Sequence, residues 1–340
     1  MSRSERVVVA MDKFRSTASA HDLCASIIAR VASGATFDAV VLSDGGEGFR
    51  SSFDGEVVRL RARDPWGEWC DAPLTIVPSS RETLGVLEVA EIIGRSHRRA
   101  PTSLEALAAS SEGVGDAILA STVWGVTRVV VGCGGSATSD GGEGCFDVLR
   151  RAGGLGIALS AATDITADFF GALRYAEQKG VATSDLRVVA QRLERLADEY
   201  ERESGRDVRR VARTGAAGGL GGALLAAGAT LVSGFDEVAR VNALASRIDA
   251  ASTVITGEGR LDAGSLEGKV VAGVCALTSE RQRVLVVCGS QDAVAASELT
   301  RRYPWVRVVD LVSRFGHRRA FEDTLECVGD TVTDFLANQS

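Results

Sequence analysis

Three apolar, β-branched runs of this chain end in turns of glycine and carboxylate residues, and this pattern restricts the fold more than any other. The clearest extends from Val129 to Gly144 and reads VVVGCGGSATSDGGEG. Val40 to Gly48 ends in the same six letters, SDGGEG, and Val254 to Asp262 reads VITGEGRLD. β-Branched residues favour buried strands, and glycine permits tight turns. We therefore predict parallel strands that place acidic loops at their carboxyl ends.

The longest of these loops suits a phosphate group. Its bare backbone at Gly134 and Gly135 brings N–H groups close to an anion. Ser136 and Thr138 add hydroxyl donors, and Asp140 adds oxygens of the kind that Mg²⁺ accepts beside a nucleotide. The alternative interpretation, a strand-to-helix turn whose glycines serve packing, stays open for any single loop.

Length and composition bound the class of protein. A chain of 340 residues predicts two domains, and 45% hydrophobic against 24% charged residues predicts a folded protein. A net charge of -7 argues against nucleic acid or an anionic membrane as partner. We find no signal peptide, no long apolar stretch and no disulfide or zinc pattern among the seven cysteines, so we expect a cytoplasmic protein.

The predicted helices and strands alternate at both ends of the chain but not in the middle. Strands at 7–10 and 38–42 flank a helix at 16–30 that starts at Ser16 or Ser19. Segments 57–63, 72–77 and 84–89 read as short antiparallel strands, and a helix at 103–120 follows.

This texture predicts an α/β fold of two domains. Residues 1–50 and 212–340 form a doubly wound domain with a parallel sheet, and residues 51–211 form an inserted α/β domain.

Lysine is rare in this chain. Of 38 basic residues only Lys13, Lys179 and Lys269 are lysines. A compact ammonium suits a phosphate site where a planar guanidinium is too large. Random drift in composition is the alternative explanation.

Carboxylates follow several predicted strands. Asp12, Asp44 and Glu258 follow strands of the outer domain, and Asp140 and Asp164 follow strands of the inserted one. Ligands bind beyond the carboxyl ends of such strands, so acidic groups and lysines facing one cleft predict metal-assisted phosphoryl transfer. The P-loop, protein-kinase and dinucleotide signatures are absent. Each carboxylate also has an alternative role as a helix cap or turn former.

Six segments together resemble the bacterial glycerate kinase family, the type without a P-loop. They are AMDKFRS at 10–16, DGGEG at 44–48, GGSATSDGG at 134–142, QKG at 178–180, GAAGGLG at 215–221 and TGEGRLD at 256–262. This resemblance covers nearly the whole chain. It implies phosphorylation of D-glycerate by ATP with Mg²⁺, usually to 2-phosphoglycerate, and a flavodoxin-like domain with an inserted domain likened to a restriction-endonuclease fold.

The chain departs from the family pattern in the first loop, which usually reads APDSFKGS. Here Lys13 stands at the serine and Arg15 at the lysine, and the segment between Leu149 and Asp164 is shorter than in the family. Two alternatives therefore stay open: a kinase of another small hydroxy acid or polyol, and a non-catalytic binder of anionic metabolites. A homodimer is one assembly that the sequence leaves open.

We assign the site residues as hypotheses from these patterns and this resemblance, with Asp44 or Asp164 as the base. The assigned catalytic residues are Asp44, Asp140, Asp164 and Lys179. The assigned nucleotide- and phosphate-binding residues are Gly134, Gly135, Ser136, Thr138 and Lys269. The assigned substrate-binding residues are Lys13, Arg15 and Arg260, and the assigned Mg²⁺ ligands are Asp140 and Glu258.

Overall fold

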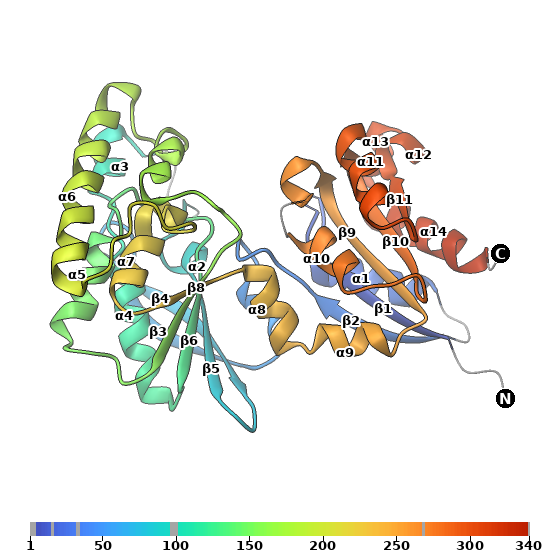
Figure 1. Ribbon diagram of the computed structural model, residues 1–340, viewed down its shortest axis with the longest axis horizontal. Coiled ribbons are helices and arrows are strands. Elements are labelled where there is room, and N and C mark those ends of the chain that lie inside the picture. The colour runs from blue at the N-terminus through green and yellow to red at the C-terminus, as the bar shows by residue number, and fades with distance from the viewer. Residues whose placement is uncertain (1–4, 15–16, 32–34, 96–100, 267–268, 339–340) are drawn as a thin grey trace. The chain divides into compact units, whose positions relative to one another are not determined.

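The chain folds into two compact units, each with its own sheet (Figure 1). The structure is a computed structural model that describes residues 5–14, 17–31, 35–95, 101–266 and 269–338. Unit 1 comprises Met1–Asp44 and Phe235–Ser340, and unit 2 comprises Gly45–Gly234.

Unit 1 is built on a five-stranded parallel sheet. Its spatial order is β11 (Val306–Asp310), β10 (Arg283–Gln291), β9 (Thr253–Leu261), β1 (Arg6–Met11) and β2 (Thr36–Val41). Counted along unit 1 alone, this is the order 2-1-3-4-5 of flavodoxin-like sheets, as the family resemblance implies. The chain places β2 on one side of β1 and β9, β10 and β11 on the other, so the strand order reverses between β1 and β9.

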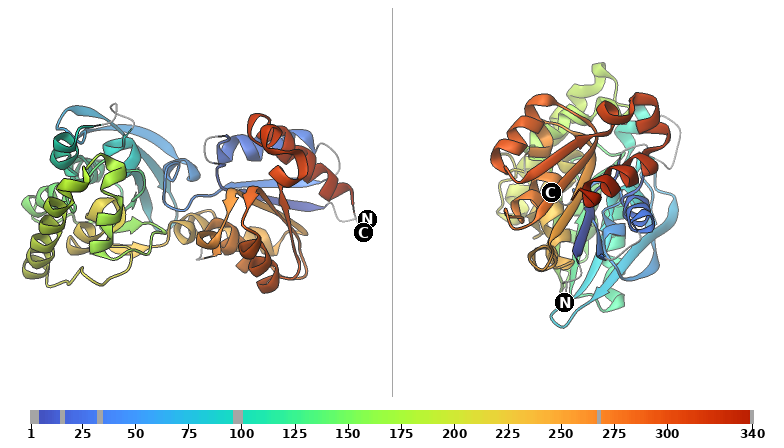
Figure 2. Two further views of the ribbon diagram at one scale, coloured as in Figure 1. Left: turned by 90° about the horizontal axis from the view of Figure 1, so that it is seen from above. Right: turned by 90° about the vertical axis from the view of Figure 1, so that its right-hand side faces the viewer.

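Helices cover both faces of this sheet (Figure 2). On one face, Leu23 and Ile27 of α1 (Ala20–Arg30) and Val328 of α14 (Thr324–Ala337) bury against β1, β9 and β10. The other helices of unit 1 are α8 (Gly234–Val241), α9 (Leu244–Asp249), α10 (Val270–Ala276), α11 (Ala293–Arg302), α12 (Leu311–Phe315) and α13 (His317–Glu322). Ser19 caps α1 by accepting a hydrogen bond from the Asp22 amide, as predicted; Ser16 lies outside the described residues.

Unit 2 contains a mixed six-stranded sheet. Its order is β3 (Glu56–Arg63), β4 (Trp69–Pro78), β5 (Thr83–Glu88), β6 (Arg128–Gly132), β7 (Ala158–Ala162) and β8 (Thr230–Val232). The first three strands are antiparallel, which confirms the predicted change of texture, and the remaining pairs are parallel. Asp64 forms the turn between β3 and β4 by accepting the amides of Trp66 and Glu68.

The α-helices of unit 2 are α2 (Val89–Ile93), α3 (Ser103–Ala108), α4 (Glu112–Ser121), α5 (Glu143–Arg151), α6 (Leu186–Ser204) and α7 (Leu220–Ala226). The short helix α2 was not predicted. The single helix predicted at 103–120 is wrong, because Ser111 leaves the helix to donate two hydrogen bonds to Asp140. Within the described ranges, no helix combines the length and apolarity needed to cross a membrane.

The unit boundaries also differ from the predicted ones at 50/51 and 211/212. The structure places them at 44/45 and 234/235. Strand β8 pairs with β7, so the segment before Phe235 completes the sheet of unit 2. Gly45 and Gly46 pack against the backbone of Ala162 and Gly134, which holds the segment after Asp44 in unit 2 as well.

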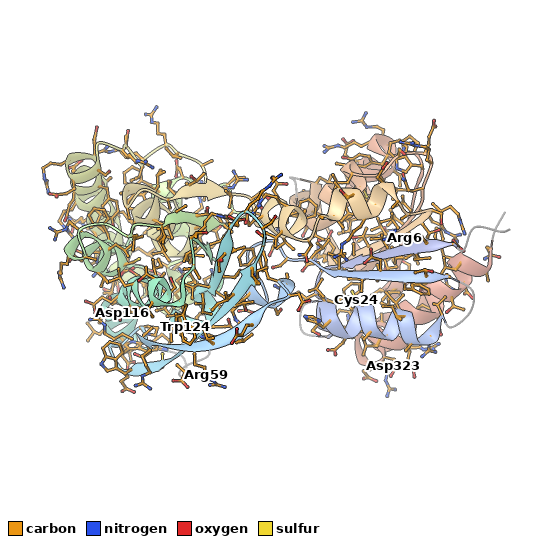
Figure 3. The ribbon with its side chains drawn as sticks, turned by 90° about the horizontal axis from the view of Figure 1, so that it is seen from below. Arg6, Cys24, Arg59, Asp116, Trp124 and Asp323 are labelled. Carbon is orange, nitrogen blue, oxygen red and sulfur yellow. The ribbon has the colours of Figure 1, made fainter. Side chains whose placement is uncertain are left out.

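All seven cysteines are free thiols, and all but Cys70 are buried. Cys24 lies between α1 and the sheet, with its sulfur 3.8 Å from the Val9 carbonyl oxygen (Figure 3). Burial raises the pKa of this thiol to about 11. Such thiols remain protonated near neutral pH and pack as small apolar side chains.

Candidate functional site

A pocket of about 350 Å³ opens in unit 1 at the point where the strand order reverses. Asp12, Lys13 and Phe14 follow β1 and line it, and Glu258 and Arg260 line it from β9. In a parallel sheet the loops after the first and third strands diverge at this switch point and leave a crevice, which is where doubly wound proteins bind ligands. The topology therefore explains why the pocket lies at the carboxyl ends of β1 and β9.

Glu258 is the most perturbed group of the pocket. Its side chain is buried, and its Oε1 atom has no hydrogen-bond partner. Burial raises the pKa of this carboxyl to about 8; a hydrogen bond from Ser265 and the charge of Lys269 oppose the rise, whereas Asp12 and Asp262 add to it. A buried acceptor without a partner is costly, so this oxygen is suited to accept a hydrogen bond or a cation from a ligand.

The cations of the pocket come from three different segments. Lys13 follows β1 and Lys269 precedes α10, and both are half-buried. Arg260 is more open, with 71% of its side chain exposed and its Nε atom 4.0 Å from Asp262. These three groups, with Asp12 and the half-buried Asp44, give the pocket both charge signs. The structure thus brings together Lys13, Asp44, Glu258, Arg260 and Lys269, five of the residues predicted from the sequence.

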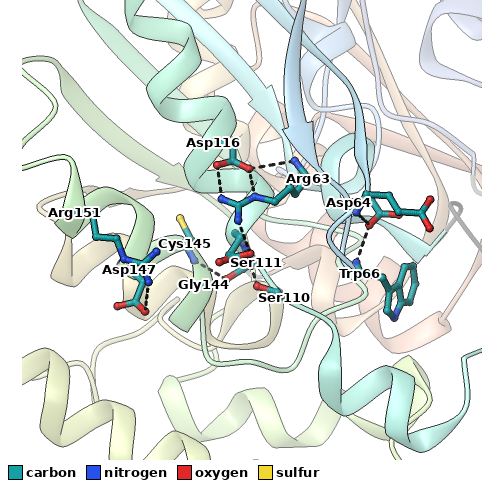
Figure 4. Close-up of polar contacts among 12 residues, drawn as sticks. Arg63, Asp64, Trp66, Ser110, Ser111, Asp116, Gly144, Cys145, Asp147 and Arg151 are labelled. Carbon is teal, nitrogen blue, oxygen red and sulfur yellow. Dashed lines mark hydrogen bonds and ion pairs between the residues drawn. The ribbon is translucent and has the colours of Figure 1, made fainter.

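Asp140 lies in unit 2, where it organises the long glycine-rich loop. Its Oδ2 atom accepts hydrogen bonds from the amide and hydroxyl of Ser111 at 2.8 and 2.7 Å and from the Gly144 amide at 3.3 Å. Its Oδ1 atom accepts from the Gly142 amide at 3.1 Å. Ser111 also accepts from the Cys145 amide, beside the Arg63–Asp116 ion pair (Figure 4). Both oxygens are engaged, which favours the turn-forming interpretation of Asp140.

Lys179 is buried in the same unit. Its Nζ atom donates to the Ser136 hydroxyl at 2.8 Å and to the Thr138 carbonyl at 2.7 Å. Burial lowers the pKa of this ammonium to about 7, although the charge of Asp140 opposes the shift. The buried hydroxyls of Thr138 and Ser139 have no hydrogen-bond partner. Through its two hydrogen bonds Lys179 holds the loop that was predicted to bind phosphate.

The glycines of the repeated motif serve close packing between two loops. A Cβ atom at Gly134 would lie 2.4 Å from the Gly46 Cα atom, and one at Gly135 would lie 2.8 Å from the Ala90 side chain. Buried Glu88 holds the loop that contains Gly46, because its carboxylate accepts hydrogen bonds from the amides of Gly48 and Arg50. The packing interpretation therefore accounts for Gly134, whatever else its amide does.

The other predicted site residues do not line the pocket or lie outside the described residues. The Asp164 carboxylate in unit 2 accepts the Gly234 amide at 3.0 Å, at the start of α8. Arg15 lies outside the described residues. Ser265, Ala320 and Phe321 are among the pocket residues that were absent from the prediction. Ser265 lies three positions after Asp262 in the third acidic loop, a spacing typical of turns, whereas nothing local in the sequence marks Ala320 or Phe321.

Of the two residues assigned to Mg²⁺, only Glu258 suits the ion. Among the residues that the structure describes, no group of three or more His, Cys, Asp or Glu side chains is arranged to hold a metal ion. Asp140 does not fit, because its oxygens already hold the loop. Glu258 fits, because Mg²⁺ in nucleotide sites takes only one or two carboxylates, with phosphate and water completing its shell. The fold and this pocket define a doubly wound α/β protein with a ligand site at its switch point.

Comparison with known proteins narrows this class. The model of the glycerate kinase family matches residues 7–152 and 155–332, so the chain belongs to the glycerate kinase family. An uncharacterised protein of Mycobacterium bovis is 35% identical over 313 residues, covering 86% of this chain and 81% of its own. The glycerate 2-kinase of Escherichia coli is 28% identical over 331 residues, covering 84% and 85%.

A solved structure shares the fold. The putative glycerate kinase 2 of Salmonella typhimurium LT2 superimposes with a TM-score of 0.78 at 24% identity, over 99% of this chain and 100% of that one. The similarity therefore includes both units.

Proposed function

We propose that this chain transfers the γ-phosphoryl group of ATP to a hydroxyl of D-glycerate, giving 2-phosphoglycerate. Membership of the glycerate kinase family supports the reaction class. The observation that carries the proposal is the unit 1 pocket, where a buried carboxylate with an unpartnered oxygen lies among lysines and further carboxylates. Phosphoryl transfer needs positioning and neutralisation of charge more than covalent chemistry, and this set of groups supplies both.

The residue types of the pocket divide the work. Lys13 and Arg260 bind the carboxylate of glycerate, and Lys269 binds phosphate oxygens. Of the two proposed bases, Asp44 is favoured because it lines the pocket, whereas Asp164 holds the start of α8. Asp44 orients the acceptor hydroxyl and takes its proton as the phosphoryl group moves.

Mg²⁺, when bound with the nucleotide, neutralises phosphate charge, and Glu258 is the residue proposed to hold it. In unit 2, Lys179 fixes Ser136 and Thr138 through its two hydrogen bonds. We propose that this fixed loop keeps its hydroxyls and the amide of Gly135 ready for a phosphate group.

A coupled assay of ADP release tests the proposal. D-glycerate, L-glycerate, other small hydroxy acids and polyols are each supplied with ATP, with and without Mg²⁺, and ³¹P NMR identifies the product. Glu258→Gln should abolish turnover, whereas Glu280→Gln, the same change at an exposed position of unit 1, should leave it unchanged.

The outcomes separate three functions. ADP release with D-glycerate supports the proposal, and the NMR spectrum decides between 2- and 3-phosphorylation. Release with another acceptor alone would assign the chain to a different kinase. Binding of anionic metabolites with no release for any acceptor would make it a binding protein.

A further inference from the structure

The lining of the unit 1 pocket contains two chemically different groups of side chains. One group consists of the carboxylates and cations described above. The other is apolar: Phe14 and Ala320 belong to one apolar cluster, Phe321 is the next residue on α13, and we call these three residues the apolar end of the pocket. The pocket's volume of about 350 Å³ falls in the range of pockets that hold drug-sized ligands. A three-carbon hydroxy acid is much smaller and has no apolar face, so it leaves the apolar end unexplained.

Phe321 is the unusual residue of this apolar end. It lies on α13 with 46% of its surface exposed, although Ala320 beside it is buried. The ring of His317 stacks on Phe321 with centroids 4.5 Å apart and an interplanar angle of 14°. This stack fixes the plane of the Phe321 ring, and the ring still contributes to the pocket wall.

Exposure alone does not distinguish Phe321 from other apolar side chains of this protein. Val294 of α11 and Leu104 of α3 are 78% and 79% exposed, and neither lines the pocket. Scattered residues of this kind are normal on protein surfaces. Phe321 differs because its exposed ring faces the pocket that also contains buried Phe14 and the unpartnered oxygen of Glu258.

We propose that the apolar end of the unit 1 pocket binds the base of the donor nucleotide, with the base stacked on Phe321. This inference rests on the proposed function only in taking a nucleotide as the phosphoryl donor. A nucleotide combines a planar aromatic base, ribose hydroxyls and an anionic tail. Aromatic rings stack on bases, carboxylates such as Asp12 accept ribose hydroxyls, and lysines such as Lys269 bind phosphate. One pocket presents all three kinds of group.

The test measures binding of the full-length chain to three ligands by calorimetry, with Mg²⁺ present and no acceptor. The ligands are ATP, AMP and tripolyphosphate, which lacks base and ribose. The variants are Phe321→Ala, Phe321→Trp and the control Phe170→Ala. Phe170 is a comparable exposed aromatic residue in unit 2, with 39% of its surface exposed.

Phe321→Ala should weaken ATP and AMP binding by roughly tenfold, the loss typical of one base–aromatic stack, and leave tripolyphosphate binding unchanged. Phe321→Trp should retain or strengthen nucleotide binding, and Phe170→Ala should change none of the three. Equal weakening of all three ligands would show a structural role for the ring and overturn the inference. Unchanged nucleotide binding with a raised KM for the acceptor would overturn it too.

The binding assay also separates this inference from the proposed function. A wild-type chain that phosphorylates no acceptor, yet shows the base-dependent loss at Phe321, refutes the proposed function and supports the base site. A chain that phosphorylates D-glycerate while Phe321→Ala binds ATP normally refutes only the base site.

Discussion

Replacing Lys179 by methionine should remove a rise of stability with pH in unit 2. Burial lowers the pKa of the Lys179 ammonium to about 7 from its ordinary value of 10.5, and Arg95 adds to the shift while Asp140 opposes it. Between these two pKa values the unfolded chain binds more protons than the folded chain. The free energy of unfolding therefore rises with pH across this window, and below it the contribution of Lys179 is constant.

The structure sets the size of this effect. A fully buried group that titrates with this shift gives a slope of roughly 1.4 kcal/mol per pH unit. Between about pH 7.5 and about pH 9.5 the wild-type chain should gain roughly 2 to 3 kcal/mol more than Lys179→Met. The comparison between the two proteins cancels the contributions of the other titrating groups, which both retain.

Urea unfolding followed by tryptophan fluorescence measures the difference. In a Trp305→Phe background the remaining tryptophans, Trp66, Trp69 and Trp124, all belong to unit 2. Arg187→Met is the control, because it exchanges an exposed basic residue of α6 for the same side chain. This control should keep the wild-type slope. If Lys179→Met also keeps it, Lys179 does not titrate as a buried ammonium and the reasoning fails.

Three further predictions follow from contacts in the two units. Asp140→Asn should lower the melting temperature by several degrees, because the new amide nitrogen would face N–H and O–H donors that now bind a carboxylate oxygen. Scanning calorimetry at neutral pH measures this change. An unchanged melting temperature would show that Asp140 is not needed to hold the loop and would favour its role as a ligand-binding residue. Glu258→Gln should stabilise the chain increasingly from pH 5 to pH 8. The pKa of the Glu258 carboxyl is raised to about 8 in the folded state, so the wild-type chain loses stability as pH rises above the ordinary pKa of a glutamate. If unfolding in urea gives parallel curves of stability against pH for the two proteins, this prediction is wrong. Gly218→Ala should destabilise the chain far more than Gly228→Ala. Both glycines have a positive φ, but only at Gly218 would a Cβ atom lie 2.1 Å from the Thr138 carbonyl oxygen. Equal losses of melting temperature in the two variants would show that backbone strain, and not this clash, determines the cost.

Local sequence signals predicted most of the fold. β-Branched runs became β1, β6 and β9, and the turn residues around Asp64 correctly marked the antiparallel part of unit 2. The alternation of helices and strands at the two ends indicated a doubly wound parallel sheet, and the family resemblance implied its flavodoxin-like form. The break between α3 and α4 could not be predicted, because Ser111 is drawn out of the helix by Asp140, far away in the sequence.

The candidate site was predictable only in part, for a related reason. Asp44, which follows β2, is placed by topology and could be found from the sequence. Glu258 was predicted to follow its strand, but it lies within β9, because the strand continues through the glycines to Leu261. A carboxylate in a glycine-rich turn has the same appearance whether it binds a ligand or its own backbone, so Asp140 could not be interpreted without its contacts. Phe321 enters the pocket from α13, and its role depends on tertiary packing alone.

The pairing of β1 with β9 has a consequence for biosynthesis. Val7 lies beside Thr253, and the whole of unit 2 is encoded between them. A ribosome therefore releases a complete unit 2 while the apolar strand RVVVAM still lacks a neighbour on that side. Unpaired apolar strands promote association between nascent chains. Because β1 waits for β9, chaperones should engage the amino-terminal segment during translation. A chain terminated after Gly234 would leave β1 and β2 permanently without β9.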